Sequence, residues 1–199
     1  MKTLMTTLLL SMSVVCLGND YTLSSNGEEH IKSFEKCSLT SYWDANGYSI
    51  GYGHHGKDVK KNQRISQTQA EKLFSEDVKE AQDGANRLIA SLPYKYKFNQ
   101  SFYDGLCDLV YNCGEGGVRQ SEFYRRLKRC RVRNGKMNNS DYEYTLSAVK
   151  TCRISCDGHK TRRKATHLLM GNLKQLTMYW SHAIKQAEPS TSQRVSLTT

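Results

Sequence analysis

The feature that most constrains this chain is a glycine-rich stretch from Asn46 to Gly56, which follows a run of Tyr, Trp, Ser and Ile residues. Glycine weakens helices and permits the positive backbone angles that tight turns need. An Asn-Gly pair between residues of high strand propensity is typical of a β-hairpin turn. Residues 39–55 are therefore predicted to form a small hairpin that turns at Asn46-Gly47.

Helical patterns flank this hairpin on both sides. Apolar residues at helical spacing predict a short helix over about 27–35, so that Glu35 lies at its end. A longer helix is predicted to begin at a capping box formed by Ser66 and Gln69 and to end before Pro93. The candidate N-caps of the short helix are Ser24, Ser25 and Asn26.

The second half of the chain is predicted to be mostly helical. The first expected helix runs from Asn99 or Ser101 to Cys113-Gly114, and the second covers 123–133 and is closed by Gly135. The third begins at a second capping box, Ser140 with Glu143, and ends at about 151. Two more helices are expected over 161–173 and 176–187. A length of 199 residues suits one domain. The sequence thus predicts an α+β fold, mainly helical with a small β lobe.

The N-terminal segment has the pattern of a signal peptide. Lys2 precedes an apolar run, and small residues lie just before position 19. We expect residues 1–18 to be a signal peptide, 19–188 the folded domain and 189–199 a disordered tail. The alternatives are a retained anchor and lipidation at Cys16. In each case the protein is exported, to the periplasm or the extracellular space.

An even number of cysteines remains beyond the expected signal peptide. In an exported chain this favours disulfides. Zinc binding is the alternative, because Cys152, Cys156 and His159 are close in sequence and Cys130 could join them. The six cysteines are Cys37, Cys107, Cys113, Cys130, Cys152 and Cys156.

The formal net charge is +10, which implies an anionic partner. For an exported protein that partner could be a cell wall, a membrane surface or extracellular nucleic acid. Charge alone does not choose among these three.

Two carboxylates near the hairpin suggest a specific chemistry. Glu35 ends the first predicted helix, and Asp44 follows nine residues later beside the glycine-rich stretch. Hydrolysis of a glycosidic bond uses such a pair, in which one carboxyl protonates the leaving oxygen and the other acts on water or on the forming cation. Spacing alone is weak evidence, because acids nine residues apart are common.

The residues around this pair are more specific. The stretch from Glu35 to His54, with Asp44, Gly47 and then Ser49-Ile50-Gly51-Tyr52-Gly53-His54, resembles the active-site segment of the phage-type lysozymes (endolysins, muramidases). Residues 102–117 resemble the central helix of that family, and residues 158–169, with Arg162-Arg163, its C-terminal helix. The resemblance implies a lysozyme-like α+β fold with the active-site cleft between its lobes.

The resemblance also implies roles for individual residues. Glu35 would be the general acid, Asp44 the carboxylate that positions or activates water, and Ser49 would stand where the family has Thr. The implied substrate is the β-1,4 bond from N-acetylmuramic acid to N-acetylglucosamine in peptidoglycan. The implied substrate contacts are Tyr52, Gly53, Asn112 and Ser121. The alternative role of Tyr52 and Gly53 is to give the hairpin its backbone conformation, and that of Asn112 is to cap a helix end.

Further expectations concern partners. We expect peptidoglycan glycan strands and anionic wall polymers as partners, a monomer, and neither nucleic-acid binding nor stable membrane insertion after signal removal. No metal or organic cofactor is expected. His54 is predicted to be a structural partner of a carboxylate.

The chain departs from the family pattern at Ser49 and in a loop between Asp44 and Ser49 that is one residue shorter. These departures leave open the alternative that the protein binds peptidoglycan but is catalytically weak or inactive. The second rival function, a cationic protein acting on membranes or nucleic acid by charge, does not explain the order of the motif residues. Lytic transglycosylases cleave the same bond without water, so the end of the product must be examined to distinguish the two reactions.

Overall fold

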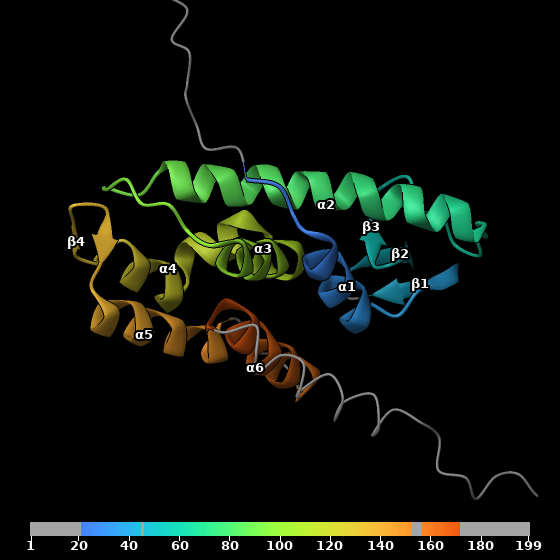
Figure 1. The fold of residues 1–199 in the computed structure, drawn as a ribbon. Coiled ribbons are helices and arrows are strands. Elements are labelled where there is room, and N and C mark those ends of the chain that lie inside the picture. Colours follow the sequence, from blue (N-terminus) through green and yellow to red (C-terminus); the bar gives the residue numbers. More distant parts are fainter. Residues whose placement is uncertain (1–20, 45, 153–156, 172–199) are drawn as a thin grey trace, which may run out of the picture.

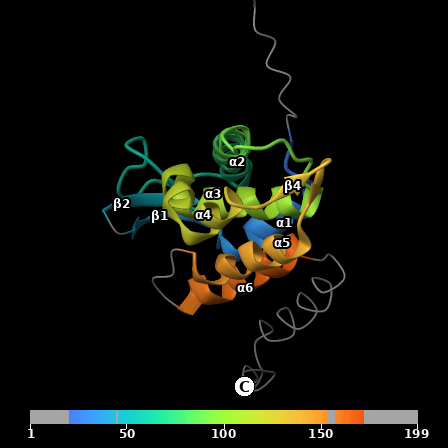
Figure 2. The same ribbon diagram turned by 90° about the vertical axis from the view of Figure 1, so that its left-hand side faces the viewer.

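The computed structural model describes residues 21–44, 46–152 and 157–171. The predicted signal peptide, the helix expected over 176–187 and the predicted tail lie outside these residues. The molecule is elongated, with a three-stranded sheet at one end and a two-stranded sheet at the other (Figure 1). The helix α3 (Gln100–Gln120) lies between α2 (Gln67–Ala90) on one side and α5 (Asn139–Ser147) and α6 (Asp157–Gly171) on the other (Figures 1 and 2).

The predicted hairpin is confirmed and gains a third strand. The antiparallel strands β1 (Ser38–Asp44), β2 (Gly47–Gly51) and β3 (His54–His55) pair in the order β1-β2-β3. Gly47 already belongs to β2, where it pairs with Asp44. Two glycines with positive φ, Gly51 at 64° and Gly53 at 90°, reverse the chain between β2 and β3.

The two predicted helices that flank the sheet are present. The helix α1 (Ser25–Phe34) begins at Ser24, whose side chain accepts a hydrogen bond from the Gly27 amide, and Glu35 is the residue at its C-terminal end. The capping box of α2 also forms, because Ser66 and Gln69 each accept a backbone hydrogen bond from the other.

The central helix α3 is longer than predicted. It is capped by Asn99, whose side chain accepts from the Phe102 amide at 2.8 Å. Gly114, with φ 69° and ψ 156°, kinks the helix where we expected it to end, and a further helical segment continues to Gln120. A glycine adopts this conformation without a steric penalty, so Gly114 changes the direction of the chain without ending the element.

The prediction of a basic helix over 123–133 is wrong for the second half of that range. The helix α4 (Glu122–Leu127) is followed by strands β4 (Val132–Arg133) and β5 (Lys136–Met137). Asn134 and Gly135 have φ values of 50° and 69°, so they form the turn of a second hairpin.

The next predicted helix has a different cap. It begins as α5 after Asn138, whose side chain accepts from the Asp141 amide, so the expected capping box of Ser140 and Glu143 does not start it. The 3-10 helix η1 (Ala148–Thr151) completes the segment that was predicted to end near 151, and α6 starts four residues before the position expected from the sequence.

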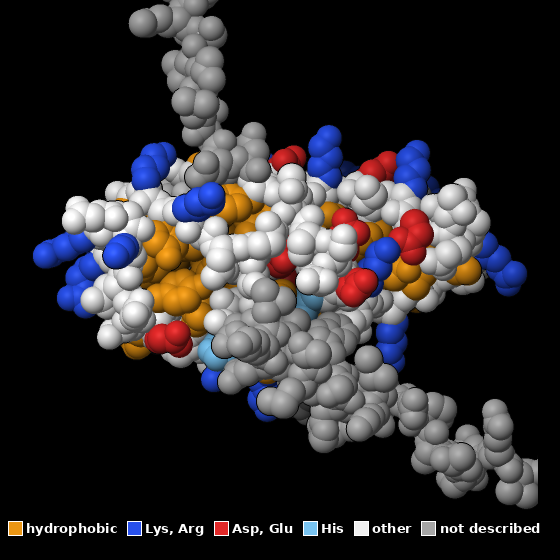
Figure 3. All heavy atoms as spheres, in the orientation of Figure 1, with side chains coloured by type: hydrophobic (Ala, Val, Ile, Leu, Met, Phe, Trp, Pro, Cys, Tyr) orange, Lys and Arg blue, Asp and Glu red, His pale blue; other side chains and the backbone are white. Residues whose placement is uncertain are grey.

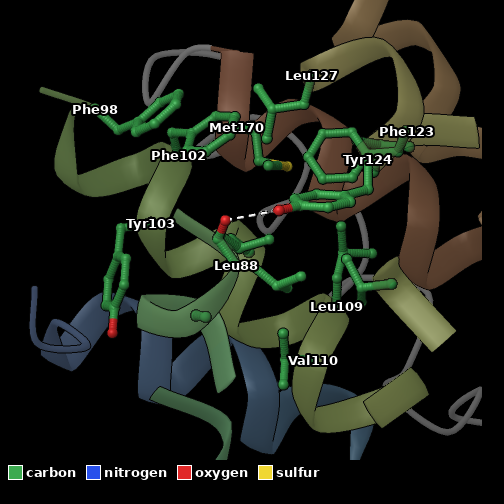
Figure 4. Close-up of a cluster of buried hydrophobic side chains, with 14 of the residues drawn as sticks. Leu88, Phe98, Phe102, Tyr103, Leu109, Val110, Phe123, Tyr124, Leu127 and Met170 are labelled. Carbon is green, nitrogen blue, oxygen red and sulfur yellow. Dashed lines mark hydrogen bonds between the residues drawn. The ribbon is translucent and has the colours of Figure 1, made fainter. Parts of the chain in front are cut away.

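The main hydrophobic core surrounds α3. Aromatic rings from several segments meet there: Phe98 stacks on Phe102 with ring centroids 4.3 Å apart, and the Tyr124 hydroxyl donates to the Leu88 carbonyl at 2.7 Å (Figure 4). A smaller cluster of Ile31, Phe74 and Val78 joins α1 to α2. Within the described residues, every helix is too short or too polar to cross a bilayer.

Candidate active site

Glu35 lies between α1 and the sheet, with its side chain 20% exposed. Its backbone N–H donates to the Ile31 carbonyl at 3.1 Å, which fixes the residue at the helix end. One carboxylate oxygen accepts a hydrogen bond from Arg162, and the other, Oε2, faces Gly53. A Cβ at Gly53 would lie 3.3 Å from this oxygen, and the φ of 90° there also favours glycine.

Arg162 is held by a second, fully buried carboxylate. Its Nη2 lies 2.7 Å from Oδ1 of Asp108, and its Nε donates to the same oxygen at 2.9 Å. Burial alone raises the pKa of Asp108, but the charge of Arg162 and the contact with His30 outweigh it and hold that pKa well below the usual range. Arg162 is therefore a fixed cation against Glu35.

Asp44 and Ser49 project from the same face of the hairpin. Ser49 pairs with Tyr42 across β1 and β2, and residues directly opposite each other share a face. Asp44 lies two residues beyond Tyr42 and so shares that face. Asp44 is exposed, whereas Ser49 is fully buried.

Tyr42 connects this face to Glu35. Partial burial raises the pKa of Tyr42, and the negative charges of Asp44 and Glu35 raise it further. The phenol therefore lies in the field of both carboxylates, and it is also hydrogen-bonded to Ser49. Tyr42, which the sequence analysis did not include as a site residue, is thus paired with Ser49 across the strands and feels the charges of Glu35 and Asp44.

His55 is a second residue that the sequence analysis missed. Its Nδ1 lies 3.0 Å from the Ser49 hydroxyl, because His55 pairs with Ser49 across β2 and β3. Gly47 makes room for the imidazole, since a Cβ at that position would lie 2.7 Å from Cε1 of His55. The available signal was a histidine immediately after the recognised His54, but its role depends on the strand register.

His54 has the role that the sequence predicted. Its Nδ1 lies 2.9 Å from Asp77 on α2, and its Nε2 lies 3.0 Å from Asp58. Burial lowers the pKa of His54, but the hydrogen bonds with Asp58 and Asp77 outweigh it and raise the pKa. His54 therefore ties β3 to α2 as the partner of a carboxylate.

A cavity of about 260 Å³ opens beside this group of residues, between the sheet, α2 and α3. Gly53 contributes to its wall, and Oε2 of Glu35 lies 3.3 Å from where a Cβ of Gly53 would be, although Glu35 itself does not line the cavity. Tyr111 lines it from α3, and burial, followed by the charges of Asp77 and Glu35, raises the pKa of this tyrosine. His55 lines the same cavity.

The other predicted substrate contacts have different surroundings. The Tyr52 ring packs against Phe74, and its hydroxyl donates to Glu71 at 2.7 Å, so this side chain is directed to α2. Ser121 is buried and caps α4: its hydroxyl accepts from the Tyr124 amide and donates to the Val118 carbonyl. With both partners inside the protein, Ser121 forms no part of the site proposed below.

Asn112 is half-buried on α3, next to the cavity residue Tyr111. Its side-chain oxygen accepts a hydrogen bond from Arg163. This contact fixes the orientation of the amide, whose nitrogen is the group left to donate to a ligand.

The cysteines in the described part of the chain are free thiols, so the predicted disulfides are not confirmed. Cys156 lies outside that part. Across residues 21–44, 46–152 and 157–171, no group of three His, Cys, Asp or Glu side chains is placed to hold a metal ion.

Several known phage proteins are similar to this chain. The sequence model of the family described as phage lysozyme matches residues 32–166. The endolysin of Salmonella phage P22 is 32% identical over 110 residues, which cover 53% of this chain and 72% of that protein. The endolysin of Bacillus phage B103 is 38% identical over 108 residues, 53% of this chain. The matched segment spans 39% of the B103 protein and 42% of the endolysin of Bacillus phage PZA.

Solved structures share the fold. An endolysin from Escherichia coli O157:H7 phage FAHEc1 superposes with a TM-score of 0.63 at 24% identity, covering 76% of this chain and 94% of that one. The muramidase domain of SpmX from Asticaccaulis excentricus gives 0.62 at 20% identity, covering 76% and 99%. The predicted lysozyme-like α+β fold is confirmed. Because the family model matches from within α1 to within α6 and includes Glu35, Asp44 and Arg162, the chain belongs to the phage lysozyme family.

Proposed function

We propose that this protein is a muramidase of the endolysin type. It hydrolyses the β-1,4 bond between N-acetylmuramic acid and N-acetylglucosamine in bacterial peptidoglycan. The observation that supports this most strongly is the position of Glu35, whose carboxylate is held by Arg162 on one oxygen and faces the cavity residue Gly53 with the other. Family membership and relatives named endolysins support the substrate class.

Glu35 is the proposed general acid. Its Oε2 faces Gly53, a residue of the cavity wall, and we propose that a proton on this oxygen passes to the glycosidic oxygen of a glycan bound along Gly53. The transfer leaves a carboxylate, which the fixed charge of Arg162 stabilises. Asp108 keeps Arg162 in place while this charge changes.

Asp44 is the proposed base. It is exposed on the hairpin face that also carries Tyr42 and Ser49, so water can reach it. It orients a water molecule and accepts its proton as the water attacks the sugar, with inversion, the outcome that the family resemblance favours over retention. Ser49 contacts the His55 imidazole and supports the Tyr42 phenol, which lies in the field of Asp44.

The glycan is proposed to bind along Gly53 and Asn112. Gly53 brings backbone close to the cavity, and the Asn112 amide is oriented by Arg163. Tyr52 contributes through its backbone, because its carbonyl accepts from the Tyr111 hydroxyl at 2.9 Å and so fixes one wall of the cavity.

The wall itself supplies a second kind of contact. Exposed Lys and Arg side chains gather at the end of the molecule that carries β4 (Figure 3). A groove of about 390 Å³ there is lined by Arg131, Arg133, Lys136, Met137 and Asn138. We call this surface the basic end, and we propose that it binds anionic wall polymers.

The protein acts as a monomer, outside the cytoplasm, after residues 1–18 have directed its export.

Replacing Glu35 tests this function. Glu35→Gln keeps the shape of the side chain and removes its proton, so clearing of purified cell wall should fall by at least about 100-fold. The matched control is Glu29→Gln, an exposed glutamate on α1, which should clear walls at the wild-type rate. Thermal unfolding of both variants checks the fold.

Two results would overturn the proposal. If the Glu35→Gln variant keeps more than about a tenth of wild-type activity, Glu35 is not the general acid. A wild-type protein that binds wall without releasing glycan would be the inactive peptidoglycan-binding protein.

A further inference from the structure

A buried arginine, Arg163, lies next to the proposed active site and has no carboxylate partner among the residues that the structure describes. Arg163 is fully buried, and its Nε donates to the Cys152 carbonyl at 2.8 Å. Its Nη2 donates to the Asn112 side chain and lies 2.9 Å from the Cys113 sulfur. Among the described residues no carboxylate contacts Arg163, and its Nη1 has no hydrogen-bond partner.

The neighbouring Arg162 shows what a buried guanidinium requires. It contacts two carboxylates, Asp108 and Glu35. A guanidinium stays protonated in proteins, and a buried charge without a counter-ion is costly. Arg163 therefore needs a negative charge close by, and in the described part of the chain Cys113 is the ionisable side chain in direct contact with it.

Cys113 is suited to carry that charge as a thiolate. A hydrogen bond from the Cys152 thiol, together with the charge of Arg163, lowers the pKa of Cys113 even though burial raises it. Arg163 joins the two cysteines, because its Nη2 lies 2.9 Å from the Cys113 sulfur and its Nε donates to the Cys152 carbonyl at 2.8 Å, so a second thiol lies close to the first. Cys107 and Cys130 differ, because burial raises the pKa of both.

We propose that Cys113 and Cys152 are a redox-active dithiol, in which the Cys113 thiolate is the counter-ion of Arg163 in the reduced protein. With a small-molecule disulfide as oxidant, the Cys113 thiolate attacks one sulfur and releases one thiolate, forming a mixed disulfide. Cys152 then gives up its proton and attacks the Cys113 sulfur, releasing the second thiolate. The two protein sulfurs lose two electrons, and the oxidant becomes one thiol, which takes the proton of Cys152, and one thiolate, which takes its proton from water.

The position of this pair links it to the active site. Cys113 precedes the Gly114 kink of α3, and Cys152 ends η1, before the chain leads to α6. A disulfide would tie α3 to this junction and remove the negative charge from Arg163. Among the described side chains, Asn112 would then be the one left to accept from Arg163.

The first test measures the reactivity of Cys113 in the full chain without any substitution. Alkylation by iodoacetamide is followed at each cysteine by peptide mass spectrometry as a function of pH. We expect a midpoint for Cys113 at least one unit below the value of about 8.5 for free cysteine. Cys130→Ser, a matched control, should leave that midpoint unchanged. A midpoint at about 8.5 or above would overturn the proposal.

The second test identifies the partner. Oxidised glutathione should convert the reduced protein to a form with a Cys113–Cys152 cross-linked peptide and no bound glutathione. In Cys152→Ser the reaction should stop at a glutathione adduct on Cys113. A cross-link between Cys152 and Cys156, or an unmodified Cys113, would contradict the assignment. Neither test uses wall hydrolysis, so its outcome is independent of the proposed muramidase activity.

Discussion

The two sheets of this molecule are both built around an Asn-Gly pair, yet they use glycine differently. In the second hairpin, Asn134 and Gly135 have the positive φ values of a tight turn, and nothing lies within 4 Å of where a Cβ of Gly135 would be. In the first sheet, Gly47 leaves room for His55 and Gly53 leaves room for Glu35. The first sheet thus shapes a site, whereas the second shapes only its own turn.

Their surroundings differ in the same way. Ser49, Ile50 and Gly51 of β2 are buried, and His54 ties β3 to α2. In β4 and β5 Met137 is the buried residue, and the exposed side chains belong to the basic end. We therefore expect changes in the first sheet to alter catalysis, and changes in the second to alter stability or wall attachment.

The largest expected contrast comes from changing an aspartate to asparagine near each hairpin. Asp44→Asn removes the proposed base and should lower the turnover rate by about 100-fold or more. Asp141→Asn, which breaks the ion pair with Arg131 beside the second hairpin, should keep activity within about twofold. Rates of reducing-sugar release from solubilised wall fragments compare the two. Equal losses would remove the distinction between the sheets.

A glycine-to-alanine pair gives the next effect. Gly53→Ala should lower activity at least about tenfold, because the new Cβ displaces the Glu35 carboxylate. Gly135→Ala should leave activity unchanged and cost about 1 to 2 kcal/mol of stability, the price of a left-handed residue with a side chain. Turnover and urea unfolding measure both. A fully active Gly53→Ala enzyme would contradict the close approach of Gly53 to the Glu35 carboxylate.

Ser49 tests how the hairpin face supports Asp44. Ser49→Ala leaves His55 and Tyr42 without their shared partner, and we expect about a tenfold loss of activity, since one positioning hydrogen bond is worth roughly 1 to 1.5 kcal/mol. Ser49→Thr keeps the hydroxyl and should remain active. Kinetics on solubilised fragments decide this. A fully active Ser49→Ala would show that the hydroxyl is not needed.

The smallest expected effect concerns the basic end. The double change Arg133→Gln and Lys136→Gln should weaken binding to whole wall by about two- to fivefold at low salt, and the difference should vanish near 1 M salt because the charges are screened. Activity on neutral soluble fragments should not change. Sedimentation with purified wall measures the binding. A loss that persists at high salt would argue against an electrostatic contact.

Much of the first sheet could be predicted because its signals are local. The aromatic and glycine residues of 39–55 predicted the hairpin, and the family motif within 35–54 identified Glu35 and Asp44. The second hairpin was missed because Lys and Arg suit a helix and Gly135 resembled a helix-ending glycine. The Asn134-Gly135 pair was the signal that favoured a turn.

The missing parts of the site depend on tertiary contacts. Arg162 reaches Glu35 across 127 positions of sequence, and it does so because Asp108 on another helix holds it. His55 meets Ser49 only through the register of β2 and β3, which glycines at 51 and 53 determine. Such contacts leave no periodic pattern in a single sequence.

The central claim is that this chain cleaves the glycan with water. The most direct measurement is digestion of purified peptidoglycan in H₂¹⁸O, followed by mass spectrometry of the products. The proposed mechanism predicts glycan fragments ending in reducing N-acetylmuramic acid that carry one ¹⁸O atom at the new end, and no such fragments with Glu35→Gln. Products that end in anhydro sugars without ¹⁸O, or no soluble fragments from the wild-type protein, would contradict the account.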